Sequence, residues 1–232
     1  MRRVLATLLT RIESRALLVW IAAAGAAWGF LNIADEVSEG ETAAIDRHLL
    51  LMLRRPGDPS DPIGPRWVEE FLRDVTALGG FTVLTLLTVV AVLVFAFHRK
   101  YRQAAILAGV SILAQISSQL LKGFYDRPRP LLVPHGSFVY SQSFPSGHST
   151  LAAATYLTLA TLIASLEPQR STKILVYCVA AVVVLAVGFS RIYLGVHWPS
   201  DVLAGWCLGA GWAFVGWLAL DRARAGKSLR GD

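Results

Sequence analysis

Charged and titratable side chains gather in the second half of an otherwise apolar chain, in or beside short breaks between hydrophobic segments. The set comprises three cations, two histidines and one carboxylate: Lys122, Arg129, Arg191, His148, His197 and Asp201. Ionisable groups so close to long apolar segments usually serve a function. Lysine and arginine bind phosphate oxygens, and histidine can act as a nucleophile. The set therefore predicts one anion-binding site with a reactive histidine.

The start of an apolar segment completes the predicted phosphate site. Pro145, Ser146, Gly147 and His148 stand directly before the hydrophobic run 149–166. A helix that begins there would direct unpaired N–H groups and its positive dipole end at an anion. A glycine in this position lets the anion approach the backbone closely. The three cations would supply the positive charge, and the arginines can bind phosphate oxygens bidentately.

The two histidines predict a two-step phosphoryl transfer. His197 and Asp201 are four positions apart, so both can lie on one side of a helical turn. A carboxylate on one ring nitrogen would fix the tautomer and leave the other nitrogen as the nucleophile. His148, as a cation beside the phosphate, could protonate the leaving oxygen. We expect a phosphohistidine at His197 that water then hydrolyses. We expect no metal and no other cofactor, because the acidic residues outside the predicted cytoplasmic segments do not cluster at metal-ligand spacing.

The elements that must position these residues are membrane helices. Hydrophobic residues make up 54% of the 232-residue chain and charged residues only 16%, against about 25% in soluble domains. A bilayer crossing needs about 20 apolar residues. The sequence therefore predicts an all-α polytopic membrane protein, residues 1–232 forming one domain with a retained first helix. The six expected spans are 16–34, 79–97, 103–121, 149–166, 173–189 and 201–220.

Charge placement predicts the orientation of these spans. With the N-terminus inside, the cytoplasmic segments hold 13 of the 22 Lys and Arg residues but only four of the 16 acidic residues. This agrees with the positive-inside rule. Both termini would be cytoplasmic, and the site would face the exterior or periplasm from a bacterial inner membrane. The net charge of +6 does not indicate nucleic acid, because no basic stripe alternates with aromatic residues.

The long outer connection, residues 35–78, has two apolar stripes at helical spacing, separated by a run rich in proline and glycine at 56–62. Neither stripe is long enough to span a bilayer. We expect two amphipathic helices at the outer interface, or a small cap packed over the helix ends. Either could line a route for a lipid head group.

Three motifs in the chain resemble the signatures of the type 2 phosphatidic acid phosphatase superfamily: Lys122-x6-Arg129-Pro130, Pro145-Ser146-Gly147-His148 and Ser190-Arg191-x5-His197-x3-Asp201. Within it, the chain is similar to bacterial phosphatases of phosphatidylglycerophosphate and undecaprenyl diphosphate. The resemblance implies a metal-independent phosphatase in which Asp201 assists the nucleophile His197 and His148 is the general acid. The phosphate ligands that it implies are Lys122, Arg129, Ser146, Gly147 and Arg191. Vanadium haloperoxidases share these motifs, but six spans argue against that class.

Several alternatives stay open at this point. The substrate could be undecaprenyl diphosphate, phosphatidylglycerol phosphate, phosphatidate or a lipid A phosphate. The same histidine could serve a lipid phosphotransferase, and the cations alone would suit a transporter or flippase of phosphorylated lipids. Asp126 and Arg127 could pair with each other, or Arg127 could hold an acidic lipid, and His135 could touch the substrate. The sequence does not indicate an oligomeric state.

Overall fold

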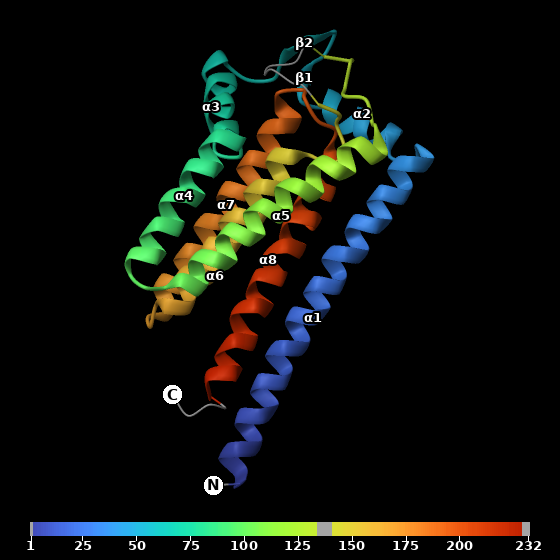
Figure 1. The fold of residues 1–232 in the computed structure, drawn as a ribbon. Coiled ribbons are helices and arrows are strands. Elements are labelled where there is room, and N and C mark those ends of the chain that lie inside the picture. Colours follow the sequence, from blue (N-terminus) through green and yellow to red (C-terminus); the bar gives the residue numbers. More distant parts are fainter. Residues whose placement is uncertain (1, 134–140, 229–232) are drawn as a thin grey trace.

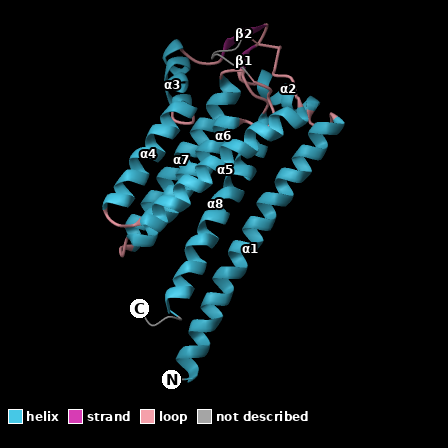
Figure 2. Cartoon of the chain, in the orientation of Figure 1, coloured by secondary structure: helices cyan, strands magenta, loops and turns pink. Residues whose placement is uncertain are grey.

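Long helices dominate the part of the chain that a computed structural model describes, residues 2–133 and 141–228. The main helices form an elongated bundle, and a small two-stranded sheet lies with α2 and α3 at one end of it (Figure 1, Figure 2). The elements in chain order are α1 (Arg2–Glu39), α2 (Ala43–Leu51), β1 (Arg54–Arg55), β2 (Asp58–Pro62), α3 (Arg66–Ala77), α4 (Phe81–Phe97), α5 (Tyr101–Tyr125), α6 (Gly147–Leu166), α7 (Arg170–Tyr193) and α8 (Pro199–Ser228).

Four of the helices are long and apolar enough to cross a membrane within the described residues: α5, α6, α7 and α8 as far as Arg222. A fifth crossing results if α3 and α4, which bend by 46° at a short break, are counted as one span. The expected second span, 79–97, corresponds to α4, and the expected first span, 16–34, lies within α1. The structure therefore supports four to five spans, and the total of six stays a prediction.

The outer connection differs from the expected pair of helices. It forms α2, an antiparallel hairpin and α3, and β1 pairs with β2 through Arg54 opposite Pro62 and Arg55 opposite Asp58. α2 ends at Leu51, and Pro56 and Gly57 form the turn between β1 and β2, where Gly57 has a φ of +87°. Two helices are present, and the short sheet at the expected break between them corrects the all-α fold class. In α3, Trp67 and Phe71 are exposed, and the placement of this helix at a membrane interface stays a prediction.

The core of the bundle is α6, which packs against α5, α7 and α8. The α6–α8 contact is unusually close because two glycines of α8 face the start of α6. A Cβ atom on Gly209 would lie 2.4 Å from the carbonyl oxygen of Thr150, and one on Gly205 would lie 2.7 Å from that of Ser146. Small residues spaced by four positions let membrane helices approach in this way. The pair Gly205 and Gly209 was not predicted from the sequence.

The glycine contact can be tested with two matched substitutions in α8. Gly209→Ala would push a methyl group into the backbone of α6, and overpacking of this kind costs about 1–3 kcal/mol. Gly211 has no atom within 4 Å of a built Cβ, so Gly211→Ala should be neutral or slightly stabilising, because alanine favours helix. Thermal unfolding in detergent should show a lower midpoint for Gly209→Ala alone. Equal midpoints would contradict the close contact.

Candidate active site

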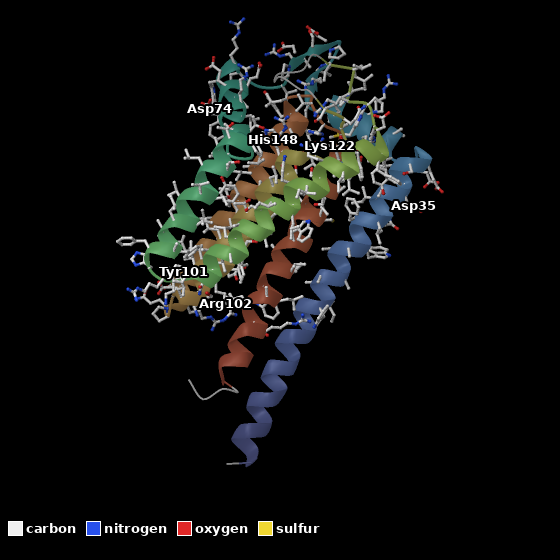
Figure 3. All side chains as sticks on the ribbon, in the orientation of Figure 1. Asp35, Asp74, Tyr101, Arg102, Lys122 and His148 are labelled. Carbon is white, nitrogen blue, oxygen red and sulfur yellow. The ribbon has the colours of Figure 1, made fainter. Side chains whose placement is uncertain are left out.

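The predicted site residues meet at the end of the bundle that bears the hairpin. Figure 3 shows Lys122 of α5 and His148 of α6 beside each other at this end. A cavity of about 190 Å³, here named the site cavity, lies among six of the eight predicted residues: Lys122, Arg129, Gly147, His148, Arg191 and His197. The other two, Ser146 and Asp201, are fully buried and do not line it.

His197 and Asp201 are joined as the sequence predicted. His197 lies in the turn before α8, and Asp201 is the third residue of that helix. The distance from His197 Nδ1 to Asp201 Oδ2 is 3.3 Å. The same oxygen accepts hydrogen bonds from the hydroxyl of Ser143 and, at 2.9 Å, from the backbone N–H of Trp198. The Asp201 carboxylate is therefore held in a fixed orientation beside the imidazole.

Arg129 identifies the tautomer of His197. Its Nη1 atom lies 3.1 Å from His197 Nε2, and a guanidinium can only donate hydrogen bonds. Nε2 must then accept, so the ring proton belongs on Nδ1, where it can be donated to Asp201. This tautomer leaves the lone pair of Nε2 on the cavity side, as a nucleophile requires.

The surroundings of His197 keep the ring neutral. Burial lowers the pKa of His197 well below its ordinary value of 6.5, and the nearby charges of Arg129, Lys122 and Arg191 lower this pKa further. Both effects disfavour the charged form. A lowered pKa favours the uncharged imidazole near neutral pH, with the Nε2 lone pair directed at Arg129.

The three cations have no carboxylate partner within ion-pair distance in the described part of the chain. Lys122 Nζ donates to the backbone oxygens of Gln142 and Ser143. Arg129 donates through Nε to the backbone oxygen of Ser141 at 2.7 Å. Arg191 Nη1 donates to the hydroxyl of Thr76 at 2.9 Å, and its buried Nε has no partner. Because none of these three cations pairs with a carboxylate of a described residue, the site cavity favours an anion.

The helix start contributes less directly than predicted. The Ser146 hydroxyl caps α6 by accepting from the backbone N–H of Ser149 at 3.4 Å, and the Ser146 N–H donates to the backbone oxygen of Asp201 at 3.0 Å. Both polar groups of Ser146 are thus used within the protein, and its role as a phosphate ligand stays a prediction. Gly147 does line the cavity, where a Cβ atom would lie 3.6 Å from Lys122 Cε.

His148 lines the cavity, and no hydrogen bond joins its ring to a described residue. The break between α3 and α4 packs onto it, since a Cβ atom on Gly79 would lie 3.3 Å from His148 Cβ and 2.4 Å from Val187 Cγ1. This glycine therefore lets the outer connection close over the first turn of α6. The ring of His148 is left available for a proton transfer to or from a bound molecule.

Several residues of the site were missed or left open by sequence reasoning. Arg127 does not pair with Asp126. Its guanidinium instead binds the carboxylates of Asp46 at 2.8 Å and Asp201 at 2.6 Å, while Asp126 accepts from the amide of Gln142. Asp46, for which the sequence predicted no role, is buried. No local sequence signal marks it, because its partners lie far along the chain. The open residue His135 lies outside the described residues.

A metal site is not evident in the described residues, where no group of three or more His, Cys, Asp or Glu side chains could hold an ion. Metal independence stays a prediction.

The titration of His197 tests the electrostatics of the site. Because its pKa is lowered below 6.5, the ring should stay neutral as the pH falls through that value and should gain a proton only in more acidic solution. Nitrogen-15 NMR of the detergent-solubilised protein reports the protonation directly, and loss of the signal in His197→Ala assigns it. A midpoint at or above pH 6.5 would show that the burial and cations do not act as described.

The sequence of the chain is similar to a known protein family and to several of its members. Residues 103–225 match the sequence model of the PAP2 superfamily. Over 146 residues the chain is 37% identical to phosphatidylglycerophosphatase B of Bacillus subtilis (strain 168). The matched region covers 62% of this chain and 70% of that protein. The chain is 33% identical over 100 residues to undecaprenyl-diphosphatase of Sulfolobus acidocaldarius, covering 43% of each.

A solved structure is similar over most of the chain. The crystal structure of a transmembrane PAP2 type phosphatidylglycerolphosphate phosphatase from Bacillus subtilis superposes with a TM-score of 0.72 at 30% sequence identity. The match covers 87% of this chain and 96% of that one. The helical arrangement and the site-bearing segments therefore follow a known architecture.

Proposed function

The chain belongs to the PAP2 superfamily and is an integral membrane phosphatase, and we propose that it hydrolyses a lipid phosphomonoester or diphosphate through a phosphohistidine on His197. The observation that carries this proposal is the buried His197, whose Nε2 lies 3.1 Å from Arg129 Nη1 at a cavity lined by three cations, none of which pairs with a carboxylate of a described residue. A protein that only bound or moved a phosphorylated lipid would need the cations but not the His197–Asp201 pair.

In the first step, Nε2 of His197 attacks phosphorus and the bond from phosphorus to the lipid oxygen breaks. His148 gives a proton to that leaving oxygen, and Asp201 stabilises the positive charge that develops on the imidazole. In the second step, water attacks the phosphohistidine while His148 takes up a proton. Inorganic phosphate leaves and His197 is restored. Lys122, Arg129 and Arg191 would hold the phosphate oxygens throughout, because phosphoryl transfer depends mainly on positioning and charge stabilisation.

A second cavity supports a lipid substrate. It has a volume of about 440 Å³, lies between α4 and α5 and is lined mostly by apolar side chains. Phe81, Gln115 and Leu151 line both this cavity and the site cavity. A hydrocarbon chain lying there would place its phosphate beside the cations. Phosphatidylglycerol phosphate, undecaprenyl diphosphate and phosphatidate all fit this description, and the first two are the substrates named for the relatives.

We further propose the orientation of the protein in a bacterial inner membrane. α1 begins and α8 ends away from the hairpin (Figure 1), which suits six spans with both termini in the cytoplasm. The site would then face the exterior or periplasm. The exposed Trp67 and Phe71 of α3 would rest in the outer interface, where aromatic side chains are favoured.

Phosphate release by the detergent-purified protein tests the proposed function. We expect turnover of at least one of phosphatidylglycerol phosphate, undecaprenyl diphosphate and phosphatidate, and we expect this turnover to persist in EDTA. His197→Ala should lower kcat by about a million-fold, as loss of the nucleophile does in a serine protease. Binding of these lipids without turnover in the intact protein would favour the transporter alternative. Turnover that survives His197→Ala would mean that another group is the nucleophile.

Cysteine labelling tests the orientation. In a background with Cys178 and Cys207 replaced by alanine, Ser60→Cys in the exposed β2 strand should react with a membrane-impermeant maleimide in intact spheroplasts. Lys100→Cys, exposed in the turn between α4 and α5, should react only after the membrane is permeabilised. The opposite pattern would reverse the proposed orientation.

A further inference from the structure

A chain of buried charges connects the outer connection to the start of α8. Asp46 of α2 is 1% exposed and Asp201 of α8 is 0% exposed. Arg127, from the segment after α5, lies between them with its side chain 13% exposed. Asp46 lies outside the three motifs, Arg127 occupies a variable position of the first one, and the proposed mechanism does not use either residue.

Arg127 is held by both of its terminal nitrogens. Nη1 donates to Asp201 Oδ1 at 2.6 Å and to the hydroxyl of Ser200 at 2.8 Å. Nη2 donates to Asp46 Oδ2 at 2.8 Å and to the hydroxyl of Thr42 at 3.1 Å. Neutral hydroxyls and two carboxylates therefore determine where the guanidinium lies. A lysine could not reproduce this fork.

The two oxygens of Asp201 have separate tasks. Oδ1 accepts from Arg127, whereas Oδ2 faces His197 Nδ1 and accepts from the hydroxyl of Ser143. A carboxylate is planar, so a partner that fixes Oδ1 also fixes the direction of Oδ2. The position of Arg127 therefore sets how Asp201 meets the imidazole.

Asp46 also determines how much of the positive charge of Arg127 neutralises Asp201. One guanidinium is shared by two carboxylates, so the three groups together keep one negative charge. If Asp46 became neutral, the positive charge of Arg127 would cancel that of Asp201. The carboxylate would then give less support to the positive charge that develops on His197 during attack.

Asp46 has a second contact with α8. Its Oδ1 atom accepts from the backbone N–H of Ser200 at 2.9 Å, and Oδ2 accepts from the Ser200 hydroxyl at 2.6 Å. Backbone N–H groups in the first turn of a helix have no partner within the helix. Asp46 thus caps α8 from a different helix and fixes the start of the segment that carries Asp201.

We propose that Asp46, acting through Arg127, is a positioning residue for the His197–Asp201 pair, so that the outer connection takes part in the reaction. This inference rests on the proposed function, because it concerns the same nucleophile. It assigns to α2 a role in fixing the orientation of Asp201 and in keeping its negative charge beside His197, in addition to covering the end of the bundle.

Asp46→Asn tests the inference because it removes the charge with almost no change in shape. We expect kcat to fall by about 10- to 100-fold, the range that results from a small misplacement of reacting groups, while KM changes by less than about threefold. The substrate is whichever of the three lipids above the wild type hydrolyses. Asp61→Asn is the matched control, because Asp61 forms the exposed pair with Arg55 at 2.9 Å in the same connection. This control should keep wild-type kcat.

A double-mutant cycle separates this role from simple stabilisation. If Asp46 acts through Asp201, Asp46→Asn should lower kcat by less than about threefold when Asp201→Asn is already present. A fully additive loss, or wild-type kcat in Asp46→Asn itself, would overturn the inference. Asp46→Glu keeps the charge and tests the case in which the asparagine variant does not fold. It should recover most of kcat, and a loss equal to that of Asp46→Asn would also overturn the inference. A wild-type protein inactive on these three lipids and on a lipid A phosphate would instead refute the proposed function.

Discussion

The close contact between α6 and α8 is the constraint on which the site depends. The helix that begins at Gly147 carries His148 beside the cations, and the helix that begins at Pro199 holds Asp201. Their backbones meet where Gly205 and Gly209 leave no room for a side chain. The hydrogen bond from the Ser146 N–H to the Asp201 backbone oxygen lies in the same contact. A displacement of either helix would therefore separate His148 from the His197–Asp201 pair.

Charge is distributed unevenly around this contact. The three cations that line the site cavity are bonded to backbone oxygens and a hydroxyl, whereas the cation behind the cavity, Arg127, is bound to two carboxylates. Cations that lack a counter-charge are ready to receive phosphate, and an arginine that is already neutralised is suited to holding a carboxylate in place. The same side chain, arginine, thus serves binding on one side of His197 and orientation on the other.

The motif residues of the site could be predicted from sequence because each one sits at the end of a strongly apolar segment. The order of the segments alone brings Lys122, His148 and His197 to one end of the bundle. The contributions of the outer connection could not be predicted, since they depend on pairings across the chain. Arg127 and Asp46 are 81 positions apart, and Arg191 and Thr76 are 115 apart. Local spacing predicted two helical stripes in residues 35–78 with a break between them, and it did not predict the hairpin at that break.

The most direct test of the account is the chemical identity of the reaction intermediate. The wild-type protein would be mixed with a phosphorus-32-labelled lipid, quenched in alkali, digested and analysed by mass spectrometry and by chromatography of phosphohistidine isomers. Because Arg129 contacts Nε2 and Asp201 contacts Nδ1, the account predicts phosphate on Nε2 of His197. Phosphate on Nδ1 of that residue, or on His148, would contradict it.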